Sequence, residues 1–220
     1  MHQSIARQLI VAATACLAMF SQANASTVIN FEGESLTGLY FAGDSFSESG
    51  FKMTVDFDAG IVDAGLALAP FAPTGNATQF YTQLNDGALI LQRSDGGHFN
   101  LDGFSAAFVP LSVDPAAPTV MVALDLESGY GVAWLFGAST NNNFPFLTYN
   151  YPADFAVFQN VTAVEFFACS LLGPCDSPTK NNGQFAIDNI NVTAVPEPTT
   201  VALMTLGLLG LGIRARRVSR

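Results

Sequence analysis

Apolar and polar side chains alternate along much of the chain. Residues 51–57 are the clearest case, because every second side chain from Phe51 to Phe57 is apolar. A period of two is typical of a β-strand with one buried face, and no long segment shows the 3.6-residue period of an amphipathic helix. Clusters of Asn, Asp, Gly and Pro separate the alternating runs roughly every 8–15 residues. We expect further strands at 78–84, 89–91, 98–108, 119–126, 132–136, 160–169 and 185–190.

Many short strands separated by turns predict an all-β fold, an antiparallel sandwich of two sheets. The chain holds 19 phenylalanines, of which only Phe20 lies in the first 25 residues. Such a supply of large apolar rings suits the facing surfaces of two stacked sheets. Gly103 interrupts the alternation within 98–108, so a bulge or bend is expected there.

Residues 1–25 have the pattern of a secretory signal peptide. Arg7 supplies a positive charge ahead of the apolar stretch from Leu9 to Phe20, which is too short to span a bilayer comfortably. Ala23 and Ala25 form an A-x-A cleavage site, so the mature chain is predicted to begin at Ser26. An uncleaved amphipathic helix is the alternative.

Residues 195–220 combine three features in a fixed order. Pro196-Glu197-Pro198 marks a break from the folded part, because proline does not continue a helix. Thr199–Ile213 carries no charge and predicts a helix of transmembrane type, although its reach of about 22 Å is shorter than a hydrocarbon core of about 30 Å. The chain then ends in an arginine cluster that favours the cytoplasmic side: Arg214, Arg216, Arg217 and Arg220.

This order of parts resembles the PEP-CTERM sorting signal. In that family the signal is carried by exported proteins of Gram-negative bacteria that make extracellular polysaccharide, and a membrane protease-transpeptidase, exosortase, processes it. The resemblance implies that Pro196, Glu197 and Pro198 form the recognition element and that the apolar helix is a transient inner-membrane anchor. It also implies that the export machinery and exosortase are partners. A plain C-terminal tail anchor, with Arg220 retained, is the alternative.

The chain is therefore expected to have three parts: a signal peptide at 1–25, a β-sandwich domain at 26–194 and a sorting signal at 195–220. The whole chain has a formal charge of −10. The sandwich domain contains 17 of the 18 acidic residues but only Lys52, Arg93 and Lys180 as bases, which makes its charge −14. Such a surface repels nucleic acid and anionic lipid and attracts divalent cations, so we expect no nucleic-acid partner.

Cysteine usage agrees with export. Cys169 and Cys175 are left once Cys16 departs with the signal peptide. In an oxidising compartment we expect a disulfide between them, closing a small loop that stabilises the fold by about 2 kcal/mol. A metal site at this pair is disfavoured, because His98 is the one histidine in the predicted mature chain.

The two ends of the sandwich domain resemble the first and last strands of jelly-roll domains of the carbohydrate-binding-module kind. The matching segments are 28–32 and 183–190. In those folds the terminal strands lie close together, and acidic residues there often hold a structural calcium ion. The resemblance implies a jelly-roll-like sandwich with Glu32 and Asp188 as calcium ligands, the remaining oxygens coming from backbone carbonyls and water. The alternative is that Asp188 caps a turn and Glu32 is solvated. No other cofactor is expected.

Exposed aromatic rings are the candidates for sugar binding. Tyr149 and Tyr151 flank Asn150 and are expected on one side of a strand, and Trp134 is the single tryptophan. The alternative is that these rings belong to the core, where alternating aromatics are also common.

No catalytic residues are assigned. A nucleophile needs a base within hydrogen-bond reach, and we find no motif that supplies such a pair. A glycosidase needs two carboxyl groups, and no particular pair stands out among the 17 acidic residues of the sandwich domain. The missing motifs favour a non-enzymatic protein, and the resemblance to the PEP-CTERM signal implies a cell-surface or matrix protein, which we expect to bind exopolysaccharide. Two alternatives stay open: a secreted polysaccharide hydrolase that uses a carboxylate pair, and a structural spacer with no ligand.

Overall fold

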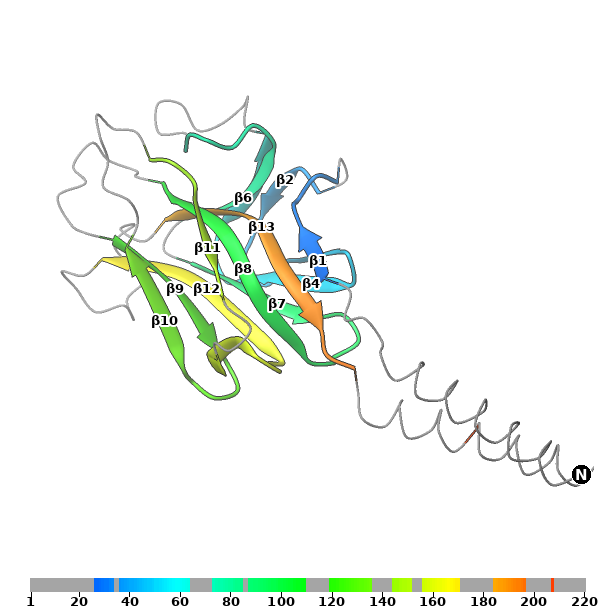
Figure 1. The fold of residues 1–220 in the computed structure, drawn as a ribbon. Coiled ribbons are helices and arrows are strands. Elements are labelled where there is room, and N and C mark those ends of the chain that lie inside the picture. The colour runs from blue at the N-terminus through cyan, green and yellow to red at the C-terminus, as the bar shows by residue number, and fades with distance from the viewer. Residues whose placement is uncertain are drawn as a thin grey trace, which may run out of the picture. The chain divides into compact units, whose positions relative to one another are not determined.

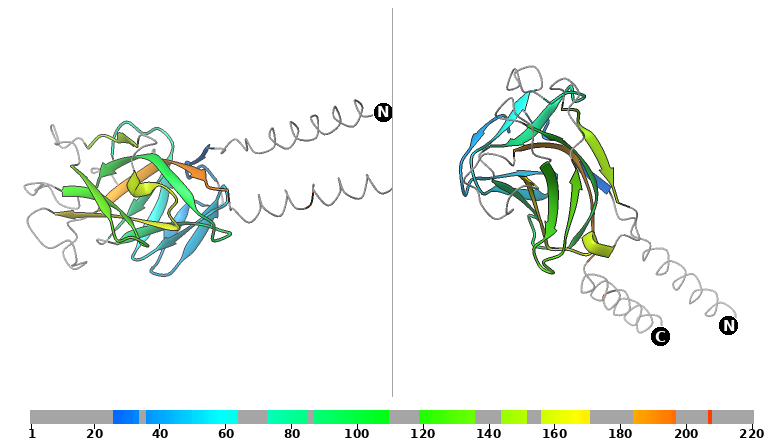
Figure 2. Two further views of the ribbon diagram at one scale, coloured as in Figure 1. Left: turned by 60° about the horizontal axis from the view of Figure 1, so that its bottom comes forward. Right: turned by 90° about the vertical axis from the view of Figure 1, so that its left-hand side faces the viewer.

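Two antiparallel sheets form the body of the protein in a computed structural model of the chain (Figure 1). The structure describes residues 26–33, 36–63, 73–84, 87–109, 119–135, 144–151, 156–170, 184–196 and 207. Ser26–Ala194 forms one compact unit, which is distinct from the two ends of the chain. Figure 2 shows the two layers of strands in this unit from two further directions.

The first sheet has seven strands. Its order is β11–β8–β13–β6–β5–β2, and β1 pairs with β13 outside this path. The strands are β1 (Ser26–Ile29), β2 (Gly38–Tyr40), β5 (Ala59–Asp63), β6 (Gln79–Gln83), β8 (Phe99–Phe108), β11 (Leu147–Asn150) and β13 (Phe185–Ala194).

The second sheet has six strands in the order β10–β9–β12–β7–β4–β3. Most connections between consecutive strands cross from one sheet to the other. The strands are β3 (Ser45–Glu48), β4 (Phe51–Val55), β7 (Ala88–Arg93), β9 (Thr119–Asp125), β10 (Gly131–Leu135) and β12 (Ala163–Ser170), and a 3-10 helix, η1 (Ala156–Phe158), precedes β12.

Alternation along each strand places one set of side chains between the sheets. In β12, Val164, Phe166 and Ala168 belong to the main core cluster, whereas the residues between them do not. Phe104 of the opposite sheet meets Phe166 edge-on, with 5.2 Å between ring centroids. Each fully buried ring of this kind contributes about 1.5–3 kcal/mol through the removal of apolar surface from water.

At Gly103 the alternation of β8 shifts, so that a different set of its side chains points toward the core. Leu101 and Phe104 both belong to the core cluster, so the alternation shifts by one residue between them. The ladder between β8 and β13 shifts register at the same place, where Asn191 pairs with Gly103. A Cβ atom at position 103 would lie 2.5 Å from the carbonyl oxygen of Tyr149, so a side chain there would push β11 away. The predicted irregularity at Gly103 is confirmed.

The sequence pattern predicted most of the strands. The two-sheet antiparallel sandwich is confirmed, and so is the adjacency of the terminal strands, because β1 pairs with β13 from Ser26 opposite Thr193 to Ile29 opposite Ile190. Strands β2, β3 and β5 were not predicted.

The two predicted terminal helices lie outside the described residues, apart from one helical position at Gly207. Among the residues that the structure does describe, no helix has both the length and the apolar character needed to cross a membrane. Both terminal helices therefore stay predictions.

Candidate functional site

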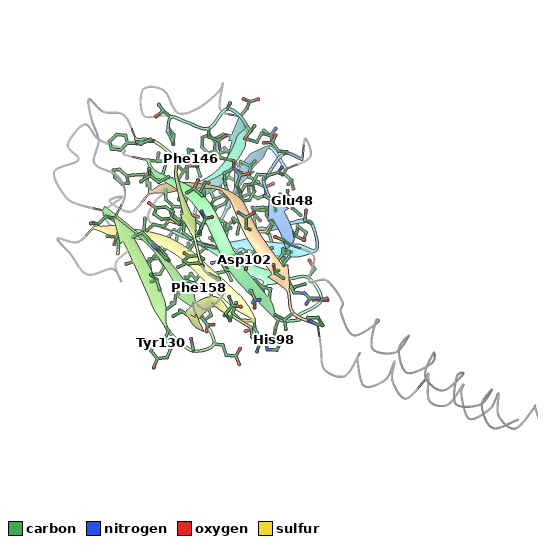
Figure 3. All side chains as sticks on the ribbon, in the orientation of Figure 1. Glu48, His98, Asp102, Tyr130, Phe146 and Phe158 are labelled. Carbon is green, nitrogen blue, oxygen red and sulfur yellow. The ribbon has the colours of Figure 1, made fainter. Side chains whose placement is uncertain are left out.

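The outward surface of the seven-stranded sheet is partly covered by loops. The side chain of Phe80 projects from β6 on the side opposite to that of the core residue Tyr81. It is nevertheless fully buried. Its ring packs edge-on against Phe146, 5.4 Å away between centroids, and Figure 3 labels Phe146. An isolated bridge between Thr74 and Pro145 joins the two covering loops, with the Thr74 N–H donating to the Phe144 carbonyl over 3.0 Å. This covered surface is a second, smaller core.

Asp188 is a fully buried carboxylate on the same outward side of β13. Its Oδ1 accepts a hydrogen bond from the backbone N–H of Asn189 over 2.7 Å. Its Oδ2 accepts bonds from Asn76 Nδ2 over 2.7 Å and from Asn189 Nδ2 over 2.9 Å. The Asn76 Oδ1 accepts bonds of 2.8 Å from the backbone N–H and the hydroxyl of Thr78, which fixes the Asn76 amide with its NH₂ toward Asp188.

Burial raises the pKa of Asp188 from its usual 3.8 to about 6. The hydrogen bonds from Asn189 and Asn76 lower the pKa, and the negative charges of Glu32 and Glu48 raise it. Glu48 lies beside β1 (Figure 3), where its two oxygens accept the backbone N–H groups of Asn30 and Phe31 over 3.1 and 3.0 Å. Two further carboxylates therefore act on Asp188 near the first and last strands.

The predicted calcium ligands Glu32 and Asp188 do not form a ready cation cage. Three N–H donors already occupy the oxygens of Asp188, and Glu32 is exposed. Within the described segments, no group of three or more His, Cys, Asp or Glu side chains is arranged to hold a metal ion. Calcium binding at Glu32 and Asp188 stays a prediction. In the structure, N–H groups of Asn76 and Asn189 stabilise the carboxylate of Asp188.

The three predicted sugar-binding aromatics lie together where the edge strands β10 and β11 of the two sheets meet. Trp134 packs edge-on against the buried ring of Phe104 at 5.6 Å, and Tyr149 lies 5.3 Å from the same ring. Tyr151 lies 5.4 Å from Trp134 and 5.0 Å from Phe158. All three side chains are half-buried and pack against the main core. The geometry assigns them a packing role, and their contact with sugar stays a prediction.

A carboxylate that the sequence analysis missed lies on the outward face of the six-stranded sheet. Glu165 stands in the middle of β12, opposite Ile90 of β7 and Leu124 of β9. It is half-buried, and no hydrogen bond or ion pair from any described residue reaches its carboxylate. Burial raises its pKa, and the negative charge of Asp56 raises it further. The missed signal was a single charge within an otherwise uncharged eight-residue strand.

The processing residues lie largely outside the described part of the chain. Pro196 is exposed, whereas Ala23, Ala25, Glu197, Pro198 and the four C-terminal arginines are not described. Cys169 is buried near the end of β12, and Cys175 lies outside the described residues. The Cys169–Cys175 pairing, the cleavage site and the roles of the sorting residues therefore stay predictions.

Residues 194–217 match the model of the PEP-CTERM protein-sorting motif. A comparison with curated proteins finds no match. Among solved structures, the chain is similar to a DUF4465 family protein from Bacteroides caccae, with 16% identity, a TM-score of 0.48 and coverage of 78% of this chain and 100% of that one. It is also similar to the CBM22-2 xylan-binding domain of Paenibacillus barcinonensis Xyn10C, with 11% identity, a TM-score of 0.34 and coverage of 79% and 100%. At such scores these similarities carry no argument about a ligand.

Proposed function

We propose that this chain, which carries a PEP-CTERM protein-sorting motif at residues 194–217, is an exported, non-enzymatic surface protein whose β-sandwich binds extracellular polysaccharide. The sorting motif is the observation that carries the proposal. It directs the protein to the cell surface or the extracellular space, so that polysaccharide is among the polymers that the sandwich meets. We extend the proposal to a Gram-negative host and to a transient inner-membrane stage before exosortase processing.

Two carboxyl groups with raised pKa values can be compared with the requirement of glycoside hydrolysis. The two acidic side chains with raised pKa values, Asp188 and Glu165, lie on the outward faces of different sheets. Glycosidase chemistry needs two carboxyl groups about 5–10 Å apart across one sugar. These two acids therefore do not form such a pair with each other, and the proposal assigns no catalytic residue.

The sorting half of the proposal is tested on the processed protein. Mass spectrometry of the protein recovered from the cell surface is expected to give an N-terminus at Ser26 and a C-terminus near Pro196 and Pro198. The same protein from a strain without exosortase is expected to keep Arg220 and to stay with the inner membrane. Surface protein that ends at Arg220 in the parent strain would overturn exosortase sorting.

The binding half is tested by retention on immobilised exopolysaccharide from the producing strain, together with a reducing-sugar assay. We expect retention that free polysaccharide competes away, and no release of reducing ends. Release of reducing ends would identify a hydrolase, and absence of both retention and release would identify a spacer. Either result would overturn the binding function while leaving the sorting half intact.

A further inference from the structure

The first and last strands of the sandwich bring both processed ends of the chain to one ladder. β1 lies antiparallel to β13, and its first residue, Ser26, pairs with Thr193, the last residue but one of β13 (Figure 1). Ser26 is also the predicted first residue of the mature chain. The sorting motif begins at Ala194, where β13 ends. The predicted signal cleavage site and the sorting motif therefore both adjoin the same end of this ladder.

Thr193 is held by both neighbouring strands. On one side it pairs with Ser26 of β1, and on the other it pairs with Asn100 of β8. Its hydroxyl also donates a 2.6 Å hydrogen bond to Asp102 Oδ2 of β8. Thr193 therefore leaves the sheet only if contacts with two strands are broken together.

The pairing continues to the last residue of β13. Ala194 lies opposite Phe99 of β8, which is fully buried. Phe99 is fixed on its other side by Val161, and the backbone N–H of each donates to the carbonyl of the other over 2.9 Å. Pro196 is exposed. The backbone thus changes from a paired strand to exposed chain between Ala194 and Pro196.

β1 is anchored at the far end of the same ladder. Ile29 lies opposite Ile190, and both side chains are fully buried in the main core. The next two residues, Asn30 and Phe31, donate their backbone N–H groups to the two oxygens of Glu48 over 3.1 and 3.0 Å. Withdrawal of β1 would expose apolar side chains and break these bonds. Opening of the ladder is therefore a costly local fluctuation, in contrast to the fraying of a loose end.

A peptide bond is cut only when the chain around it can enter a protease as an unpaired segment, so local opening limits the cleavage of folded protein. Water or an amine then takes over the carbonyl carbon, and the segment after the bond leaves with a free amine. The bonds that follow Ala194 and Val195 both draw on Ala194, which is paired. The bond between Pro196 and Glu197 is the first whose two preceding residues both lie beyond β13.

We propose that the ladder of β1, β13 and β8 sets the limit of processing on the domain side, so that the sorting protease leaves Pro196 on the mature protein. Thr193 and Ala194 form the boundary, because the bonds just after them become available only when the end of β13 leaves its neighbours. The proposal rests on the proposed function: it takes exosortase processing as given and identifies which bonds the fold withholds.

Mass spectrometry of the surface protein measures this limit. We expect mature chains that begin at Ser26 and end at Pro196 or later. Mature chains that end at Ala194 or Val195 would overturn the limit while leaving exosortase sorting intact. Surface protein that still ends at Arg220 would refute exosortase sorting and, with it, the limit.

Thr193→Pro tests whether the ladder sets the limit or the motif alone does. Proline has no N–H for a ladder and is excluded from interior strands, so the end of β13 should separate from its neighbours. We expect a share of mature chains ending before Pro196 that is larger by about tenfold, in proportion to the open population. C-termini that stay unchanged would mean that the motif alone fixes the cut, and the proposal would be wrong.

Two controls accompany this variant. Leu135→Pro places the same residue at the exposed end of the edge strand β10, in the other sheet, and should give wild-type C-termini. Thr193→Pro in a strain without exosortase should give no chains that end before Pro196. Shortened chains in either control would assign the shortening to general unfolding or to other proteases, against the proposal.

Hydrogen exchange of the full chain in detergent provides a second measurement, which does not depend on processing. In the wild type, the amide of Ala194 is expected to exchange slower than that of Glu197 by about tenfold or more. In Thr193→Pro this difference should disappear, while the amides of Leu101 and Phe104 stay protected and show that the sandwich is folded. Equal exchange at Ala194 and Glu197 in the wild type would overturn the proposal, whether or not the variant folds.

Discussion

Asp188 and Glu165 are acidic residues on the outward faces of the two sheets, and the fold treats them in opposite ways. Asp188 is fully buried and accepts three hydrogen bonds from two asparagines. Glu165 is half-buried and accepts none from the described residues. Burial raises the pKa of both carboxyls. The same direction of pKa shift therefore accompanies a structural role at Asp188, where the fold supplies donors, and no described donor at Glu165.

The largest effect is expected when Asp188 loses its cross-loop donor. Asn76→Ala removes a 2.7 Å bond to a buried carboxylate and also the Asn76 Oδ1 that accepts the Thr78 N–H. We expect the free energy of unfolding to fall by about 2–3 kcal/mol, measured by urea denaturation at pH 7. Asn150→Ala, on an exposed residue of β11, is the control and should cost less than about 0.5 kcal/mol. Equal losses in the two variants would show that the asparagine pair does not stabilise Asp188.

The pH dependence of stability gives the next largest effect. The folded-state pKa of Asp188 is about 6 and its usual value is 3.8, so the folded protein holds this proton more tightly than the unfolded chain. Stability from this group is present in full below about pH 3.8 and is lost as the pH rises through 6. Between pH 7 and pH 4, the unfolding free energy of the wild type should rise by about 2 kcal/mol relative to Asp188→Asn.

The same titration tests the predicted calcium ligands Glu32 and Asp188. A bound cation favours the ionised carboxylate, so calcium would reverse the sign of the pH dependence. With the chelator EDTA present, we expect the wild type to follow the curve described above. If added calcium makes the wild type more stable at pH 7 than at pH 4, and Asp188→Asn abolishes that gain, the ion binds there in solution.

The smallest expected effect is on Glu165. Glu165→Gln removes an unpaired charge from an apolar surface, so the protein should become more stable by about 0.5 kcal/mol at pH 7, measured by thermal unfolding. The benefit should shrink as the pH falls and the wild-type carboxyl takes up its proton. A destabilised Glu165→Gln protein would mean that the carboxylate has a structural partner, and the contrast with Asp188 would disappear.

The sequence predicted what depends on local alternation. Side-chain alternation predicted the strand around Phe51–Phe57 and the irregularity at Gly103. The resemblance of the two end segments to jelly-roll domains predicted that the terminal strands lie close together. The covered surface around Phe80 could not be predicted, because it depends on a contact between two loops that are distant in sequence. These loops contain Thr74 and Pro145, which form an isolated bridge. The apolar surroundings of Glu165 could not be predicted either. They are formed by its cross-strand neighbours in β7 and β9, which are distant in sequence.

The position of β13 has a mechanical consequence for a protein of this kind. β13 is the last strand before the sorting motif, so any tension on the C-terminal end enters the sandwich through it. It is also an interior strand, bonded to β8 along nearly its whole length and, on its other side, to β6 and β1. A pull along the strand therefore loads ladders on both of its sides at once, whereas an edge strand has a ladder on one side only. The chain therefore continues toward the sorting motif from a strand that is held on both sides.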